Sequence, residues 1–179
     1  MTKSLSLAGG CFWCVEHDLR EASGVLEVLS GYSGGSSTNP TYENHFGHRE
    51  VVHVSYDDTK TSYKKLLQYF IDHIDPTDGG GQFGDRGDSY KTAIYYENEE
   101  EKNIAQEVIK ELDDSHVYDS PSMVEILERK PFYVAEEYHQ NYADKNPAHY
   151  YMYRQGSGRE GFVQKTCQIR EEKHIIWKD

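Results

Sequence analysis

Two of the three cysteines in this 179-residue chain lie close together, in the stretch GGCFWCV at residues 9–15. Cys11 and Cys14 are separated by Phe12 and Trp13 and follow two glycines. A thiol at the start of a helix meets the positive end of the helix dipole, which favours the thiolate and lowers the pKa. Cys11 is therefore a candidate nucleophile. Cys14 would lie on the same helical face, where a disulfide with Cys11 is geometrically feasible.

The two aromatic residues between the cysteines favour an apolar wall beside the nucleophile. Phe12 and Trp13 would suit a small apolar group on an electrophilic atom, such as the methyl of a methylated sulfur; the alternative is that both rings belong to the core. Three other interpretations of the cysteine pair remain open. They are buried inert thiols, a thioredoxin-type CxxC, whose central residues are usually small or include proline, and a zinc site completed by His17 or Cys167.

A nucleophile that attacks an atom bearing a poor leaving oxygen needs a proton donor, so a carboxylic acid with a raised pKa and neutral hydroxyls are required. Glu50 is the candidate acid because GHREVV leads directly into apolar strand sequence, where partial burial raises the pKa of a carboxyl. Tyr42 in NPTY, and Asp85 and Tyr90 in FGDRGDSY, lie in loops or at strand edges. The alternative for each of these residues is a solvated or structural role.

Hydrophobic periodicity predicts the elements that must position these residues. They are a strand at 4–8, a helix at 12–20, a strand at 25–30, a loop at 31–48, a strand around 52–56, a helix from 62 to the Asp75-Pro76 break, a glycine-rich loop at 75–89 and a strand at 92–96. This order favours the α+β class, as a two-layer α/β sandwich of the split β-α-β (ferredoxin-like) type. The cysteine motif falls at the first strand-to-helix turn.

The sequence of the second half of the chain predicts less regular structure than that of the first half. A helix is expected over 99–112 and a short strand over 124–127. From Pro131 the sequence is rich in Tyr, His and Asn, with breaks at Asn146-Pro147 and at Gly156-Ser157-Gly158. We therefore expect a long irregular C-terminal segment that wraps the core, and the last dozen residues show no pattern that decides their structure.

The composition of the chain argues against some classes of binding partner and favours one cellular compartment. The net charge of −12 and the absence of a basic stretch argue against nucleic acid and anionic membranes. The N-terminus lacks a signal-peptide core and no window approaches a membrane span, so a cytoplasmic, monomeric protein with one catalytic domain over 1–179 is expected. Three cysteines in a reducing compartment stay as thiols, and their value then lies in reactivity or metal binding.

Eight short motifs in a fixed order resemble the A-type peptide methionine sulfoxide reductases over nearly the whole chain. They are GGCFW (9–13), GYSGG (31–35), NPTY (39–42), GHREVV (47–52), IDPTD (74–78), QFGDRGDSY (82–90), FYVAEEYHQNY (132–142) and KNPAHY (145–150). The resemblance implies stereospecific, thiol-dependent reduction of the S-sulfoxide of methionine, free or in proteins, and hence repair of proteins after oxidative stress.

The resemblance also implies a role for seven residues of these motifs. They are Cys11 as nucleophile, Phe12 and Trp13 as the pocket for the methyl group of the substrate, Glu50 as the acid that protonates the sulfoxide oxygen, Tyr42 and Tyr90 as the hydroxyls that bind this oxygen, and Asp85 as the supporting carboxylate. The loop ENHFGHR between Tyr42 and Glu50 is shorter than the usual family stretch and lacks the cysteine often found there.

Reduction of the sulfoxide is expected to leave a sulfenic acid on Cys11, which a second thiol converts to a disulfide that thioredoxin reduces, without metal or cofactor. Cys167 follows GSGREGF and is slightly favoured as the resolving cysteine, with Cys14 as recycler or competitor. Two other functions remain open: a general thiol-disulfide oxidoreductase that uses Cys11 and Cys14, and a zinc-stabilised or structural binding module.

Overall fold

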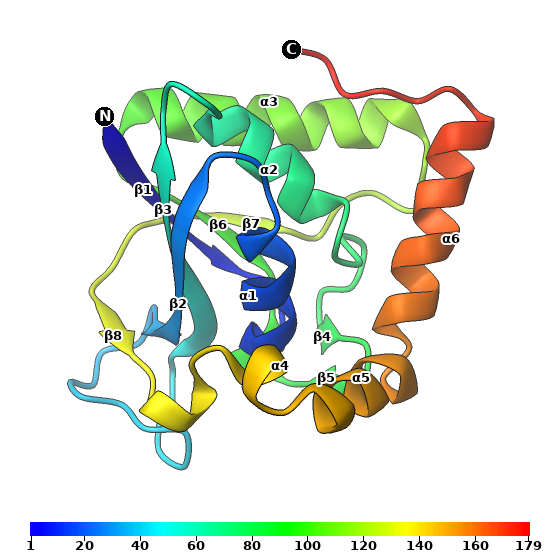
Figure 1. The fold of residues 1–179 in the computed structure, drawn as a ribbon. Helices are drawn as coiled ribbons and strands as arrows, with labels where there is room; N and C mark the ends of the chain where they lie inside the picture. Colours follow the sequence, from blue (N-terminus) through cyan, green and yellow to red (C-terminus); the bar gives the residue numbers. More distant parts are fainter.

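The computed structural model describes all 179 residues and has a mixed α/β fold around a six-stranded sheet of order β7-β6-β1-β3-β2-β8 (Figure 1). The strands are β1 (Thr2–Ala8), β2 (Val25–Ser33), β3 (Arg49–Asp57), β6 (Ala93–Tyr96), β7 (Glu125–Glu128) and β8 (Phe132–Val134). All neighbouring strands are antiparallel except β6 and β7. A separate small hairpin consists of β4 (Gly81–Gln82) and β5 (Asp85–Arg86).

Six α-helices and two short 3₁₀ helices accompany the sheet. They are α1 (Phe12–Arg20), α2 (Tyr63–Ile71), η1 (Asp88–Tyr90), α3 (Glu99–Ser115), η2 (Glu137–His139), α4 (Tyr142–Lys145), α5 (Pro147–Gly156) and α6 (Arg159–Glu172). Buried apolar residues of α1, α2 and α3 form one hydrophobic cluster with residues of β1 and β3. No helix combines the length and the apolar character needed to cross a membrane.

Local sequence explains where the first helices begin. Gly10 ends the turn after β1 with a φ of +85°, and a Cβ there would lie 2.5 Å from the Gln82 side chain, so the position requires glycine. The Ser62 hydroxyl caps α2 by accepting a hydrogen bond from the backbone N–H of Lys65 at 3.2 Å. Asn98 caps α3 in the same way at 2.9 Å. These signals are local, and the helices begin where the sequence predicts.

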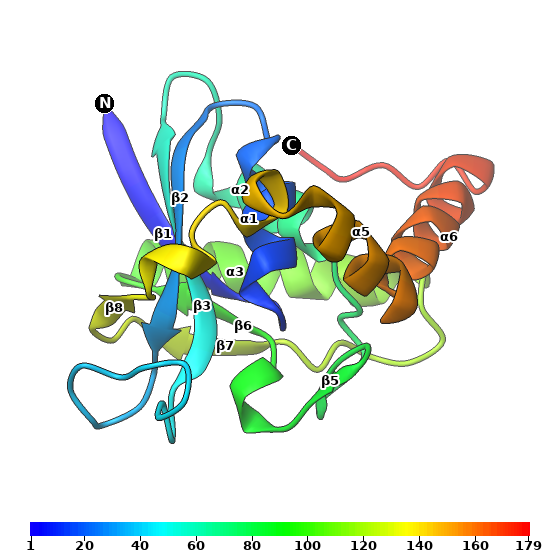
Figure 2. The same ribbon diagram turned by 60° about the horizontal axis from the view of Figure 1, so that its bottom comes forward.

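The predicted mixed α and β architecture is confirmed, whereas the prediction of a mostly irregular C-terminal segment is wrong. The chain from Tyr142 to Glu172 forms α4, α5 and α6, and α6 lies to the right of α1 and α2 in both views of the ribbon (Figures 1 and 2). The apparent breaks are helix boundaries: Pro147 occupies the first position of α5, where a missing N–H costs nothing, and Gly158 turns the chain into α6 with a φ of +92°.

Gly31 is the position at which the pairing of β2 with β8 tolerates no side chain. A Cβ on Gly31 would lie 2.3 Å from the carbonyl oxygen of Tyr133 and 2.4 Å from the ring of Phe132. We expect Gly31→Ala to lower the free energy of unfolding by about 1–3 kcal/mol, the usual cost of overpacking. Urea unfolding measures this change.

Gly161→Ala is the matched control, because the position lies inside α6 with no atom within 4 Å of its Cβ. It is expected to raise the free energy of unfolding by up to about 1 kcal/mol through helix propensity. A Gly31→Ala protein as stable as the parent would contradict the packing described for β8.

Candidate active site

A small pocket of about 70 Å³ lies at the N-terminal end of α1. Its lining consists of Cys11, Phe12, Trp13, Tyr42, Glu50, Asp85, Tyr90 and Tyr153. Seven of these eight residues are the nucleophile, ring, acid and hydroxyl candidates from the sequence, and they come from α1, β3, β5, η1 and the loop before β3. The fold therefore gathers candidates spread over eighty residues of sequence into one cavity.

Cys11 is the N-cap residue of α1 and is only 5% exposed. Burial raises the pKa of the Cys11 thiol well above its usual value, and the neighbouring Cys14 and Glu50 add to the rise. The sequence predicted a lowered pKa from the helix dipole. The effect of the dipole is outweighed because the free-energy cost of removing a thiolate from water is larger than the stabilisation that the partial charge at a helix end provides. Cys11 is a thiol in the resting protein.

Glu50 lies in β3 and is 2% exposed, and its Oε1 accepts a hydrogen bond from the backbone N–H of Phe12 at 3.1 Å. Burial raises the pKa of Glu50 to about 8, with the negative charge of Asp85 adding to the rise. The hydrogen bonds from the Phe12 N–H and the Tyr90 hydroxyl oppose it. Glu50 is therefore mainly protonated at neutral pH and can donate a proton into the pocket.

Three tyrosine hydroxyls surround the same space. Burial raises the pKa of Tyr42, Tyr90 and Tyr153, so all three are neutral hydrogen-bond donors at physiological pH. The hydroxyl of Tyr153, from α5, donates a hydrogen bond to the Asp85 carboxylate. Sequence reasoning missed Tyr153 because it assigned this region no helix; the only available signal was the run of tyrosines at 150–153.

The segment around η2 and α4 holds the Trp13 ring in place. The indole Nε1 of Trp13 donates a hydrogen bond to Nδ1 of His139 at 3.0 Å, and the Trp13 ring stacks on Tyr142 with centroids 3.8 Å apart. Phe12 packs against His139 with a centroid distance of 5.0 Å. Burial lowers the pKa of His139, which keeps it neutral and leaves Nδ1 free to accept. Both rings are thus rigidly supported beside Cys11.

The two remaining cysteines lie in different surroundings. Cys14 is fully buried and lies in one cluster with Cys11 and Tyr150. Cys167 is exposed on α6, where its thiol lies 3.9 Å from the Glu171 carboxylate. No group of three or more His, Cys, Asp or Glu side chains has an arrangement that could hold a metal ion. The structure therefore places Cys14, and not Cys167, beside Cys11.

The chain matches known proteins in both sequence and fold. The family model described as peptide methionine sulfoxide reductase matches residues 3–171. The peptide methionine sulfoxide reductase MsrA of Bacillus licheniformis is 51% identical over 164 residues, covering 89% of this chain and 91% of the relative. The structure of methionine sulfoxide reductase A of Corynebacterium diphtheriae matches with a TM-score of 0.76 at 30% identity, covering 82% of this chain and 76% of that chain. The reduced form of Mxr1 from Saccharomyces cerevisiae matches with a TM-score of 0.76 at 28% identity, covering 82% and 87%.

The raised pKa of Glu50 predicts a pH dependence of stability. Between the ordinary value of 4.5 and the folded value of about 8, the folded protein binds a proton that the unfolded chain has lost. Stability should therefore fall as pH rises through this window, by up to about 1.4 kcal/mol per pH unit. In Glu50→Gln this contribution to the slope is absent, which urea unfolding at several pH values measures.

The exposed carboxylate of Glu128 in β7 provides the control, since Glu128→Gln should leave the pH dependence of the parent unchanged. Identical slopes for the parent and Glu50→Gln would show that Glu50 titrates as an ordinary carboxyl.

Proposed function

The chain belongs to the peptide methionine sulfoxide reductase family and is an oxidoreductase, and from this premise we propose that it reduces the S-sulfoxide of methionine through a sulfenic acid on Cys11. Family membership supports methionine sulfoxide reduction and protein repair. The proposal rests above all on one observation, the presence in one pocket of the Cys11 thiol and a Glu50 carboxyl that is mainly protonated at neutral pH. The epimer assay described below tests it.

In the first step, the sulfoxide oxygen lies against the Glu50 carboxyl and the hydroxyls of Tyr42 and Tyr90, while the substrate methyl group packs against Phe12 and Trp13. Proton donation from Glu50 makes the substrate sulfur electrophilic, and the Cys11 sulfur attacks it. In net terms the oxygen passes from the substrate sulfur to the Cys11 sulfur. The products are methionine and a sulfenic acid whose hydrogen comes from Glu50, and the proton of the Cys11 thiol returns to the Glu50 carboxylate.

In the second step, we propose that Cys14 resolves the sulfenic acid by forming a disulfide with Cys11. The sequence slightly favoured Cys167, on the expectation of a mobile tail. Cys167 instead lies within the regular helix α6, eight residues beyond Arg159, which is about 12 Å along the helix axis. Cys14 lies in the first turn of α1, three residues after Cys11 and in the same buried cluster, so its attack needs no rearrangement of α6.

The proposed cycle ends with reduction of the disulfide by an external thiol, for which a thioredoxin-type reductant is our proposal. No cofactor or metal is required by this chemistry. It also needs a reducing compartment, and the cytoplasm is the proposed location. We further propose that the chain forms one catalytic domain and works as a monomer.

The first functional prediction concerns stereospecificity. With dithiothreitol as reductant, the protein should convert the S epimer of methionine sulfoxide to methionine and leave the R epimer unchanged. Cys11→Ser should abolish turnover, and Glu50→Gln should lower the rate by roughly 10²- to 10⁴-fold through loss of the proton donor. Methionine formed from each epimer is measured by chromatography. Equal turnover of both epimers, or none, would overturn the proposed function.

The second functional prediction concerns the resolving cysteine. After one turnover without reductant, peptide mapping should find the Cys11–Cys14 disulfide in the parent and in Cys167→Ser. In Cys14→Ser, the sulfenic acid on Cys11 should persist and react with dimedone. A disulfide that requires Cys167 and forms without Cys14 would contradict the assignment and restore Cys167 as the resolver.

A further inference from the structure

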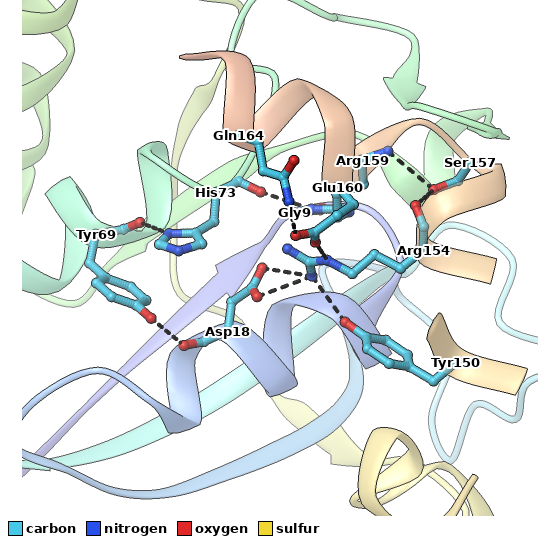
Figure 3. Close-up of polar contacts among 10 residues, drawn as sticks. All are labelled: Gly9, Asp18, Tyr69, His73, Tyr150, Arg154, Ser157, Arg159, Glu160 and Gln164. Carbon is cyan, nitrogen blue, oxygen red and sulfur yellow. Dashed lines mark hydrogen bonds and ion pairs between the residues drawn. The ribbon is translucent and has the colours of Figure 1, made fainter. Parts of the chain in front are cut away.

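Arg159, at the start of α6, is a buried cation without a carboxylate partner. It is 2% exposed, and its guanidinium donates hydrogen bonds to the carbonyl oxygens of Gly9 at 2.8 Å and His73 at 3.1 Å (Figure 3). None of the ion pairs of the structure includes Arg159. Its guanidinium also lies 4.8 Å from the centroid of the Phe83 ring. A buried charge balanced only by neutral groups is unfavourable, which calls for an anion nearby.

The carboxylates near Arg159 are already used by a second arginine. Arg154 of α5 forms ion pairs with Asp18 at 3.0 Å and with Glu160, and also donates to the Tyr150 hydroxyl at 2.9 Å. Figure 3 shows the Arg154 guanidinium directed at Asp18 and Tyr150, while Arg159 is directed at the turn before α1. Arg154 is thus fully compensated and Arg159 is not.

The face of α1 that carries Cys14 is the face covered by α5 and α6. Cys14 and Asp18 are four residues apart and therefore lie on one side of the helix. Cys14 packs against Tyr150, and Arg159 borders the same crevice as Val15 and Asp18. The proposed reaction creates an anion, the Cys14 thiolate, on this face of α1.

We propose that Arg159 is the positioning residue of the resolving step: it fixes the turn at Gly9 and balances the charge of the Cys14 thiolate that attacks oxidised Cys11. This inference rests on the proposed function. The Cys14 thiolate attacks the sulfur of the Cys11 sulfenic acid, the S–S bond forms and the S–O bond breaks. The Cys11 sulfur is reduced as the Cys14 sulfur is oxidised, and the proton released by Cys14 ends on the leaving oxygen as water.

The electrostatics of Cys14 agree with this role. The hydrogen bond with Cys11 lowers the pKa of Cys14 to about 7; burial opposes this change, and the charges of Arg159 and Arg154 reinforce it. The titratable and charged groups that surround Cys14 are Cys11, Asp18, Glu50, Tyr150, Arg154 and Arg159. Among them, Arg159 is the cation without a carboxylate of its own.

The first test measures the Cys14 thiol directly and does not depend on sulfoxide reduction. In a Cys11→Ser, Cys167→Ser background, Cys14 is the sole cysteine, and NMR of labelled cysteine follows its titration. Arg159→Met should raise the pKa of Cys14 by about one unit or more, the usual effect of a nearby charge. Arg159→Lys keeps the charge and should stay within about half a unit of the parent.

Two outcomes would overturn the inference: an unchanged pKa of Cys14 in Arg159→Met, or a rise in Arg159→Lys as large as that in Arg159→Met. Arg159→Gln retains an amide donor for the Gly9 carbonyl and is measured in parallel, so that a folding failure of the methionine variant leaves the test intact. If only Arg159→Lys folds, a rise of the pKa of Cys14 beyond about half a unit in that variant contradicts the proposal.

The second test follows disulfide formation after one turnover as a function of pH. A rise of about one unit in the pKa of Cys14 lowers the thiolate population tenfold at low pH but makes each thiolate about threefold more nucleophilic. Arg159→Gln should therefore form the disulfide about threefold more slowly below pH 7 and up to about threefold faster above both pKa values. Arg159→Lys should restore the parent profile.

A merely structural role of Arg159 would scale the rate equally at every pH, and a profile without the crossover would overturn the inference. Release of methionine in the same experiment separates the two proposals. If no methionine is released by the parent, the proposed function fails. If methionine is released but the profile of Arg159→Gln is not shifted, the role of Arg159 fails alone.

Discussion

The hydrogen bond between the Phe12 backbone N–H and the Glu50 carboxyl is the constraint on which the rest of the site depends. It joins the first turn of α1 to the central strand β3 and thereby fixes the Glu50 carboxyl relative to the start of the helix that Cys11 caps. A carboxyl buried there remains mainly protonated, because the single N–H cannot offset the loss of water around its charge. The pocket therefore contains a protonated carboxyl at neutral pH, although the chain as a whole carries a net charge of −12.

The C-terminal third of the chain completes this environment from outside the sheet. The amide of Gln140 bonds to both backbone groups of Ser30 in β2, at 2.9 and 2.8 Å, and Glu16 of α1 accepts from the Asn141 N–H at 2.7 Å. These buried bonds fix the segment that carries the ring supports of Trp13. Helix α5 then delivers Tyr153 to the pocket, and α6 ties its first residue to the turn before α1. A segment that resembles loop sequence thus acts as structural support for the site.

The surroundings shift the pKa values of the two neighbouring thiols in opposite directions. Burial raises the pKa of Cys11 well above its usual value, whereas the hydrogen bond with Cys11 lowers the pKa of Cys14 to about 7. A nucleophile that rests as a thiol is protected from adventitious oxidation, because oxidation follows thiolate character. Cys14, the thiol with the lowered pKa, is fully buried.

The sequence by itself determined the chemical groups, the boundaries of α1 and the need for glycine in the turn before it, because periodicity, caps and backbone freedom are local properties. It also identified seven of the pocket residues through motifs that lie far apart along the chain. Only the tertiary structure decided the direction of the pKa shift of Cys11, the presence of Tyr153 and the choice of Cys14 as the thiol beside Cys11. Each of these depends on burial and on which helix covers which face, and α5 and α6 set both through contacts of long sequence separation.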